Sequence, residues 1–256
     1  MCLIVFSYKN HPKYDLVFAA NRDEFYKRPA KAAQFWDEHP HILAGKDLSA
    51  GGTWMGVTKN GFLSALTNYR DPSIQKNDPP SRGHLVLNYL IEEKEPESYI
   101  KEIDQKADQY NGFNLVAGHF NELAYYSNQQ QGYQILNPGV YGLSNHLLDT
   151  PWPKVKQTKN ELSNLLEQTD INKEQIFNLL IHDQPAPEEE LPDTGIPKEI
   201  EKAVSPPFIK MDEYGTRSST VLLITKSGEV IFEERRFKSG SQKVKNKNQF
   251  KFNIET

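Results

Sequence analysis

Two apolar stretches near the start of the chain, Cys2-Leu-Ile-Val-Phe-Ser-Tyr8 and Asp15-Leu-Val-Phe-Ala-Ala20, decide the predicted fold. Both are rich in β-branched and aromatic residues, and the turn-forming segment Lys9-Asn-His-Pro-Lys13 lies between them. We therefore expect an antiparallel hairpin. Pairing across this turn places Cys2 opposite a residue between Ala20 and Arg22, at one end of a sheet.

The second apolar stretch is followed at once by Asn21-Arg-Asp-Glu24, so four polar residues gather at the sheet end where Cys2 lies. We expect Arg22 to lower the pKa of the thiol or to bind a substrate carboxylate, and Asp23 to hold an ammonium group. The same four residues also fit a charged loop that is simply exposed to solvent. The residues alone leave both interpretations open.

The rest of the chain alternates hairpins with groups of helices. The expected strands are 2–8, 15–20, 53–58, 61–67, 113–118, 122–127, 133–136, 219–225 and 229–237, with Lys59-Asn-Gly61 as a strong hairpin turn. The expected helices are 85–91, 97–108, 154–167 and 173–182, and Ser81 is the expected N-cap of the first. The proline-rich stretch 184–197 is expected to be irregular. Hairpins with helices grouped between them predict the α+β class.

The composition excludes several classes of protein. Hydrophobic residues make up 37% and charged residues 25% of the 256 residues, which excludes wholesale disorder. A net charge of -4 argues against a general nucleic-acid binder. No apolar run approaches the roughly 20 residues that a bilayer span needs. The single cysteine excludes an intrachain disulfide, and with no basic leader in sight we expect a cytoplasmic protein.

That single cysteine, Cys2, stands directly after Met1. Initiator methionine is generally removed before a small residue, so we expect the mature chain to begin at Cys2. Its α-amine, with an ordinary pKa of about 8, then accepts the proton of its own thiol, so that one residue supplies both nucleophile and general base. The alternative is that Cys2 is a small buried hydrophobe opening an edge strand.

Met1-Cys-Leu-Ile-Val-Phe6 together with Ala20-Asn-Arg-Asp-Glu-Phe25 resembles the NRDE family, which is named after that tetrapeptide and is also known through the transport-and-Golgi-organisation proteins. Ordered matches to family motifs continue along nearly the whole chain. They are Gly51-Gly-Thr-Trp-Met-Gly56, Leu66-Thr-Asn-Tyr-Arg-Asp71, Ser81-Arg-Gly83, Gly142-Leu-Ser-Asn145, Leu148-Asp-Thr-Pro-Trp-Pro-Lys154 and Tyr214-Gly-Thr-Arg-Ser-Ser-Thr220.

This family is similar to the N-terminal nucleophile hydrolases of the penicillin and bile-salt acylase branch. The resemblance implies a four-layer αββα sandwich, two antiparallel sheets covered by helices, as one domain over residues 1–256. It implies Cys2 as the nucleophile, Asn145 as a donor to the oxyanion, and Arg217 as a later arginine near the nucleophile.

In that branch an arginine and an aspartate three residues apart on the second strand assist the cysteine. Here Arg22 and Asp23 are adjacent, whereas Asn21 and Glu24 keep the spacing with different chemistry. We expect Arg22 and Asp23 as catalytic partners, and Asn21 and Glu24 as substrate contacts.

Weaker signals surround these motifs. Asn68 follows a strand and fits either a second oxyanion donor, a substrate contact or a plain turn residue. Trp54 fits either a cleft or the core, whereas Trp152, whose neighbours are prolines, is expected in the core. His39 and His41 lack further ligands nearby, so no metal is predicted. The lysine-rich segment 238–251 is typical of a solvated flank or an edge strand.

Two hypotheses from different classes follow. The first is a hydrolase that cleaves an amide or thioester through an acyl-enzyme on Cys2, with no cofactor and with a small-molecule substrate that is anionic or acylated. The second is a carrier or chaperone for haem or for acyl-coenzyme A and lipid, which uses the same cleft without chemistry. Retention of Met1 would remove the base that the first hypothesis requires.

Overall fold

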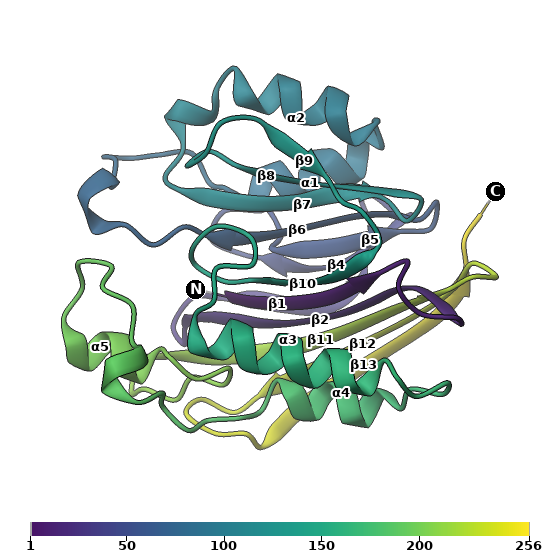
Figure 1. The fold of residues 1–256 in the computed structure, drawn as a ribbon. Coiled ribbons are helices and arrows are strands. Elements are labelled where there is room, and N and C mark those ends of the chain that lie inside the picture. Colours follow the sequence, from purple (N-terminus) through teal and green to yellow (C-terminus); the bar gives the residue numbers. More distant parts are fainter. Residues whose placement is uncertain (1, 256) are drawn as a thin grey trace.

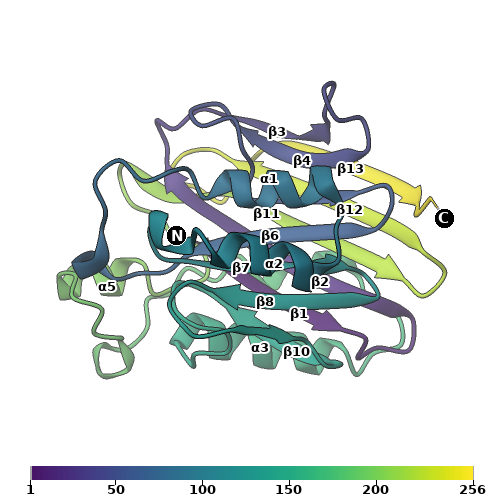
Figure 2. The ribbon, with the colours of Figure 1, turned by 90° about the horizontal axis from the view of Figure 1, so that it is seen from above.

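The computed structural model describes residues 2–255, and in it two antiparallel sheets pack face to face with helices on both outer faces (Figure 1). Helices α1 (Gly83–Glu92) and α2 (Pro96–Asp104) cover one sheet, and α3 (Pro153–Leu165) and α4 (Lys173–Leu179) cover the other. The view from above shows α1 and α2 lying over the seven-stranded sheet, roughly along its strands β6 and β8 (Figure 2). The predicted αββα sandwich is confirmed.

The six-stranded sheet has the order β10-β1-β2-β11-β12-β13. Its strands are β10 (Gly139–Leu143), β1 (Cys2–Tyr8), β2 (Tyr14–Phe25), β11 (Tyr214–Thr225), β12 (Glu229–Phe237) and β13 (Val244–Asn253). The seven-stranded sheet has the order β3 to β9. Its strands are β3 (Ala30–Phe35), β4 (Ile42–Asp47), β5 (Met55–Thr58), β6 (Phe62–Asn68), β7 (Phe113–His119), β8 (Glu122–Ser127) and β9 (Tyr133–Ile135).

Alternation along β1 and β2 fills two separate cores. Ile4 and Phe6 face the opposite sheet and pack in the core between the sheets, where Phe6 stacks on Phe18. Leu3 and Val5 point the other way and pack against α3 and α4. A third core lies between α1, α2 and the seven-stranded sheet.

The N-terminal hairpin pairs in the predicted register. Cys2 lies opposite Arg22 and Ile4 opposite Ala20. Because residues on one face recur every second position, Cys2 and Arg22 continue the face that points between the sheets, and Asn21 and Asp23 continue the face that points toward the helices. The strand end therefore divides the four polar residues between two environments.

Several predicted details are wrong or incomplete. Ser81 does not cap α1: the N-cap is Arg82, which makes no side-chain capping bond, and Ser81 contributes only its carbonyl to the N–H of His84. Strands β3, β4 and β10 and the short helix α5 (Lys198–Ala203) were not predicted. The lysine-rich tail does form an edge strand, β13. Single 3₁₀ turns occur at Pro72–Ile74, Ala107–Gln109 and Glu188–Glu190.

Two further expectations concern the chain as a whole. Removal of Met1 falls outside the described residues. Within residues 2–255, no helix is long and apolar enough to cross a bilayer.

Candidate functional site

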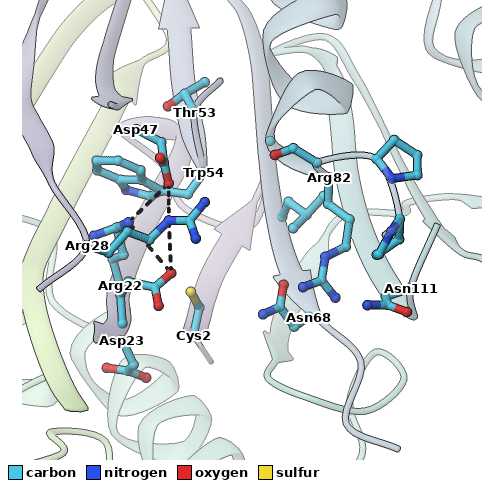
Figure 3. A pocket seen from close by; sticks show the side chains of 16 residues that line it. Cys2, Arg22, Asp23, Arg28, Asp47, Thr53, Trp54, Asn68, Arg82 and Asn111 are labelled. Carbon is cyan, nitrogen blue, oxygen red and sulfur yellow. Dashed lines mark hydrogen bonds and ion pairs between the residues drawn. The ribbon is translucent and has the colours of Figure 1, made fainter. Parts of the chain in front are cut away.

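A cavity of about 300 Å³ opens at the end of the space between the two sheets, and the Cys2 side chain lies in its wall (Figure 3). Of the residues predicted for the site, Cys2, Arg22, Asp23, Glu24 and Asn68 line this cavity. The register of β1 and β2 brings the first four together, and β6 on the opposite sheet supplies Asn68. The predicted gathering of polar groups around Cys2 is therefore present.

One wall of the cavity carries two arginines and two carboxylates. Arg28 Nε donates to Asp47 Oδ2 at 2.6 Å, and its distance to Glu24 Oε2 is 3.7 Å. Arg22 lies 3.6 Å from Asp47 and 3.8 Å from Glu24. Burial acts to raise the pKa of Asp47, but the hydrogen bond from Arg28, the backbone N–H groups of Ser49 and Ala50 and the charge of Arg28 together outweigh burial and hold that pKa below its ordinary value. The four charges balance one another.

Trp54 holds Arg22 in place within that wall. The guanidinium of Arg22 lies 4.2 Å from the centre of a Trp54 ring, a cation–π contact, and only 6% of the arginine is exposed. Trp54 in turn packs beside the core between the sheets. It serves both of the roles that the sequence left open, whereas Trp152, at 9% exposed, belongs to the helix-side core.

The opposite wall carries Arg82, Asn68 and Asn111 (Figure 3). Arg82 Nη1 donates to the carbonyl of Gly112 at 2.8 Å, and among residues 2–255 no carboxylate lies within ion-pairing distance of its guanidinium. Burial lowers the pKa of Arg82 from its ordinary value, and the Cys2 thiolate would oppose that effect. Arg82 thus gives the cavity a positive charge that no ion pair within the described chain balances.

Two glycines allow this wall to form. An added Cβ on Gly52 would lie 2.6 Å from the carbonyl carbon of Gly83, too close for any side chain. The chain before β5 can therefore lie against the first turn of α1, where the Thr53 N–H donates to the Gly83 carbonyl at 3.2 Å. This close approach sets the position of Arg82, the residue just before Gly83.

The pKa of the Cys2 thiol is shifted in the direction opposite to the one expected. Burial raises its pKa above the ordinary value, and this effect outweighs the backbone N–H of Asp23 and the charge of Arg22, both of which lower it. The expectation of a thiol activated by neighbouring arginines is therefore wrong for this structure. Arg22 lies beside Cys2, as expected, but Asp47 and Glu24 take up most of its charge.

Asp23 sits on the helix side of the strand end and is 2% exposed. Thr216 Oγ1 donates to its carboxylate at 2.6 Å, and the Tyr214 hydroxyl donates to its backbone carbonyl at 3.1 Å. Burial raises the pKa of Asp23, whereas the nearby ammonium of Lys154 acts to lower it. Asp23 is thus a buried acid held among donors.

Two predicted residues have side chains committed elsewhere. Asn21 Nδ2 donates to the carbonyls of Leu180 and Pro207, at 2.8 and 2.9 Å, in the helix layer. Arg217 occupies a β-bulge, and its Nη1 donates to the carbonyls of Phe25 and Arg28. Neither side chain contributes to the Cys2 cavity, so the expected positions of Asn21 and Arg217 within it are wrong.

Asn145 lies behind the cavity and contacts it indirectly. It is fully buried, and its Nδ2 donates to the backbone carbonyl of Asn68 at 2.9 Å. The neighbouring Ser144 Oγ donates to the carbonyl of Cys2 at 3.0 Å. Gly142-Leu-Ser-Asn145 therefore fixes the backbone at two cavity residues rather than pointing a donor into the cavity.

The sequence did not single out Arg28, Asp47, Arg82 or Asn111, which all line the cavity. Arg82 had a signal, since it stands in the motif Ser81-Arg-Gly83. Arg28 lies in the turn between β2 and β3, and Asp47 ends β4, so the unpredicted strands β3 and β4 gave no hint that these residues face Cys2. Among the described residues no group of three metal-binding side chains gathers, and the rings of His39 and His41 lie 6.2 Å apart, edge to face.

Comparison with known proteins places this site in a family. Residues 1–239 match the family described as Transport and Golgi organisation 2. The chain belongs to this family. A mouse Transport and Golgi organization 2 homolog is 38% identical over 92% of each chain, and a human homolog is 36% identical over the same share. The family resemblance drawn from the motifs is thereby confirmed.

Solved structures agree on the fold. A mutant conjugated bile acid hydrolase from Clostridium perfringens has a TM-score of 0.54 and 9% identity, and the match covers 100% of this chain and 94% of that one. At this identity the likeness concerns the fold alone. This chain thus shares the layered architecture of that hydrolase.

Proposed function

We propose that this chain, once Met1 is removed, hydrolyses an amide or thioester through a covalent acyl-enzyme on Cys2. The observation that carries the proposal is the position of Cys2: the only cysteine lies at the end of an inner strand, in the wall of a cavity between the two sheets. The fold, which a named hydrolase shares, is consistent with this role.

The reaction needs only groups at this end of the sheet. The α-amine of Cys2 takes the thiol proton, and the sulfur attacks the carbonyl carbon of the substrate. When the tetrahedral intermediate collapses, the C–N or C–S bond breaks and the ammonium returns its proton to the leaving group. Water then attacks the thioester and gives a proton to the amine. When the C–S bond breaks, the acid is released and the ammonium returns that proton to the sulfur, which restores the free thiol and amine.

Asn68 and Asn145 divide the stabilisation of the oxyanion in this proposal. The Asn68 side-chain amide lines the cavity and donates to the developing oxyanion. Asn145 fixes the backbone at Asn68, because its Nδ2 donates to the Asn68 carbonyl. Removal of one such donor typically costs about 10²–10³-fold in kcat. Asp23 holds the α-ammonium that forms when the thiol loses its proton.

Arg82 determines the class of substrate. A half-buried guanidinium that faces the cavity without a carboxylate partner favours an anionic group at that position. The substrate is therefore an acyl compound that carries a carboxylate or phosphate away from the bond that is cleaved.

Mass spectrometry of the untagged chain tests the proposal. We expect an intact mass without methionine, and an acyl adduct on Cys2 after incubation with short acyl thioesters that carry a terminal carboxylate. Cys2→Ser should lose the adduct formation while it keeps the fold. Arg82→Gln should weaken selection of the anionic thioester over its neutral methyl ester, whereas Lys156→Met, an exposed charge on α3, should leave that selection unchanged.

A retained methionine or the absence of any adduct would contradict the hydrolase.

One observation favours the second candidate, a carrier that binds its ligand without catalysing a reaction. Burial keeps the Cys2 thiol protonated to a higher pH than a free thiol, which weakens its nucleophilicity. Binding of haem or of an acyl-coenzyme A without turnover, weakened by Arg82→Gln, would support the carrier.

A further inference from the structure

Arg70 is a buried arginine close to the cavity that the proposed reaction does not use. It stands two residues after Asn68, which ends β6, and its side chain is 8% exposed. The guanidinium lies 4.9 Å from the centre of the Trp152 ring, and its Nη1 donates to Glu201 Oε2 on α5. Burying an arginine–carboxylate pair is costly unless both groups are well bonded, so the further contacts of this pair decide what it does.

Two contacts join Arg70 to Asn145. The backbone N–H of Arg70 donates to the Asn145 carbonyl at 2.8 Å, and Nη2 of its guanidinium donates to Asn145 Oδ1 at 3.4 Å. On its other side the Asn145 amide donates from Nδ2 to the Asn68 carbonyl at 2.9 Å. A guanidinium only donates and a carbonyl only accepts, so a single orientation of the Asn145 amide satisfies both neighbours. Arg70 therefore selects the orientation in which Asn145 holds Asn68.

Glu201 is bonded at both of its carboxylate oxygens, and its side chain is 3% exposed. Its Oε2 accepts from Arg70, and its Oε1 accepts from the backbone N–H of Thr194 at 3.2 Å and from the Thr194 hydroxyl. Thr194 belongs to the proline-rich segment 184–197, which precedes α5. The contacts thus form one chain from this segment to the cavity wall, through Thr194, Glu201, Arg70, Asn145 and Asn68.

We propose that Arg70 is a positioning residue for the candidate site. Its guanidinium, held by Glu201, orients the Asn145 amide. The oriented amide in turn fixes the end of β6, where Asn68 lines the cavity. Arg70 itself touches no reacting atom in the proposed reaction. The catalytic purpose of these contacts rests on the proposed function, whereas the orientation of the Asn145 amide requires no substrate.

Arg70→Lys tests the proposal, because it keeps the positive charge but loses the planar fork of the guanidinium. One ammonium can pair with Glu201 but cannot hold Asn145 as well. In the full chain labelled with ¹⁵N-asparagine, the fully buried Asn145 side-chain amide is the signal lost in Asn145→Ala. We expect Arg70→Lys to speed the exchange of its protons with solvent by about tenfold, the effect of losing one hydrogen bond to a charged group.

The core between the sheets serves as the internal reference. The backbone N–H of Val116 should exchange at the same rate in both chains, because Val116 packs in that core whereas Arg70 packs on Trp152 of the helix-side core. An Asn145 exchange rate that stays the same in Arg70→Lys would overturn the proposal. An equal rise at Val116 would also overturn it, because it would show a general loss of stability.

Two further variants complete the test. Lys202→Met removes an exposed charge of α5 that pairs with Glu188, and as the matched control it should leave the Asn145 exchange rate unchanged. If Arg70→Lys does not fold, Thr194→Val decides, since it removes one of the donors that hold Glu201. It should give a smaller rise in the Asn145 exchange rate, and the absence of any rise would contradict the proposal.

Kinetics separate this proposal from the hydrolase. If Cys2 forms the acyl-enzyme, Arg70→Lys should slow acylation at saturating thioester by about tenfold and leave the half-saturating concentration unchanged, because Asn68 acts on the oxyanion. Arg70→Lys combined with Asn145→Ala should acylate as fast as Asn145→Ala alone. Additive losses would refute the positioning role while the hydrolase stands. Faster Asn145 exchange in Arg70→Lys, with no acylation even in the unchanged chain, would refute the hydrolase and leave the orienting contact in place.

Discussion

Asn21, Arg22, Asp23 and Glu24 are consecutive in sequence but serve two faces of β2. Arg22 and Glu24 take part in the charged wall of the cavity, whereas Asn21 binds the helix layer and Asp23 accepts a hydrogen bond from Thr216. Since strand residues alternate between faces, adjacency in sequence means separation in space. Arg22 and Asp23, although adjacent in sequence, therefore point to opposite faces of β2: Arg22 toward the space between the sheets and Asp23 toward the helices.

The sequence predicted that Cys2 lies opposite a residue between Ala20 and Arg22, because a short hairpin turn leaves little choice of register, and the structure pairs Cys2 with Arg22. The sequence did not predict the state of the thiol. That state depends on how deeply Trp54, Arg22 and the opposite sheet bury the sulfur, and on the carboxylates that occupy Arg22. Desolvation is a property of the packed layers, which pairwise reasoning along one hairpin cannot supply.

The raised thiol pKa gives a prediction for the chain that still carries Met1. Its Cys2 should react with iodoacetamide at pH 7 more slowly than free cysteine, because burial keeps the thiol protonated. The rate should keep rising above the pH at which free cysteine levels off. Arg22→Ala should slow the reaction further, since the arginine favours the thiolate. A rate above that of free cysteine at pH 7 would refute the raised pKa.

At the scale of single elements, β12 carries a buried carboxylate on the outer face of its sheet. Glu233 has a side chain only 1% exposed, and it accepts bonds from Lys173 and Arg235, both at 2.7 Å. Arg235 also lies over the Phe177 ring of α4 at 3.7 Å. These contacts tie α4 to β12 where the helix layer ends.

The pH dependence of stability tests this contact. Burial acts to raise the pKa of Glu233, but its cationic and amide donors outweigh burial and lower that pKa to about 2, against an ordinary 4.5. A carboxylate with a lowered folded-state pKa stabilises the fold above the unfolded value and loses this contribution as the pH falls toward 2. Glu233→Gln should therefore lower the free energy of unfolding by about 2–3 kcal/mol at pH 7, and by progressively less below pH 4.5.

Urea unfolding of both chains at pH 7, 4.5 and 3 measures the difference. Glu229→Gln is the matched control on the same strand, because its partner Lys251 is exposed and such pairs contribute roughly 0–1 kcal/mol. A Glu233→Gln cost that does not shrink on acidification would show that packing, and not charge, makes this contact.

The elements with the clearest sequence patterns were the ones predicted correctly. The hairpins β1–β2 and β5–β6 combine continuous apolar runs with clear turns. Strand β3 reads Ala30-Lys-Ala-Ala-Gln-Phe35, which has little β-branched character and pairs with β4 irregularly. Such a strand owes its conformation to the neighbouring strand and to the sheet beneath it, which local sequence does not encode.

At the scale of the whole molecule, the core between the sheets joins the two halves. Residues of both sheets share one cluster, including Phe18 from the first and Val116 from the second. Glu234 of β12 also accepts from the N–H of Ala33 on β3 at 2.8 Å. These contacts favour a single folding unit, as one domain over residues 1–256 requires.

Tryptophans in different layers can test that unit. Trp36 reports on the core under α1 and α2, and Trp152 on the core under α3. In variants that keep only one of the two, with the other tryptophans changed to Phe, urea unfolding followed by fluorescence should give one shared midpoint. Two separated midpoints would show that the sheets unfold independently.

The two ends of the described chain lie on opposite sides of the molecule (Figure 1). Cys2 stands in the cavity wall, whereas the N–H of Glu255 donates to the carbonyl of Lys59, at the turn between β5 and β6. An affinity tag or fluorescent protein fused after the last residue therefore leaves the cavity open. The same fusion placed before Cys2 would cover the cavity and block the α-amine that the proposed reaction needs, so activity should be measured with the tag after the last residue.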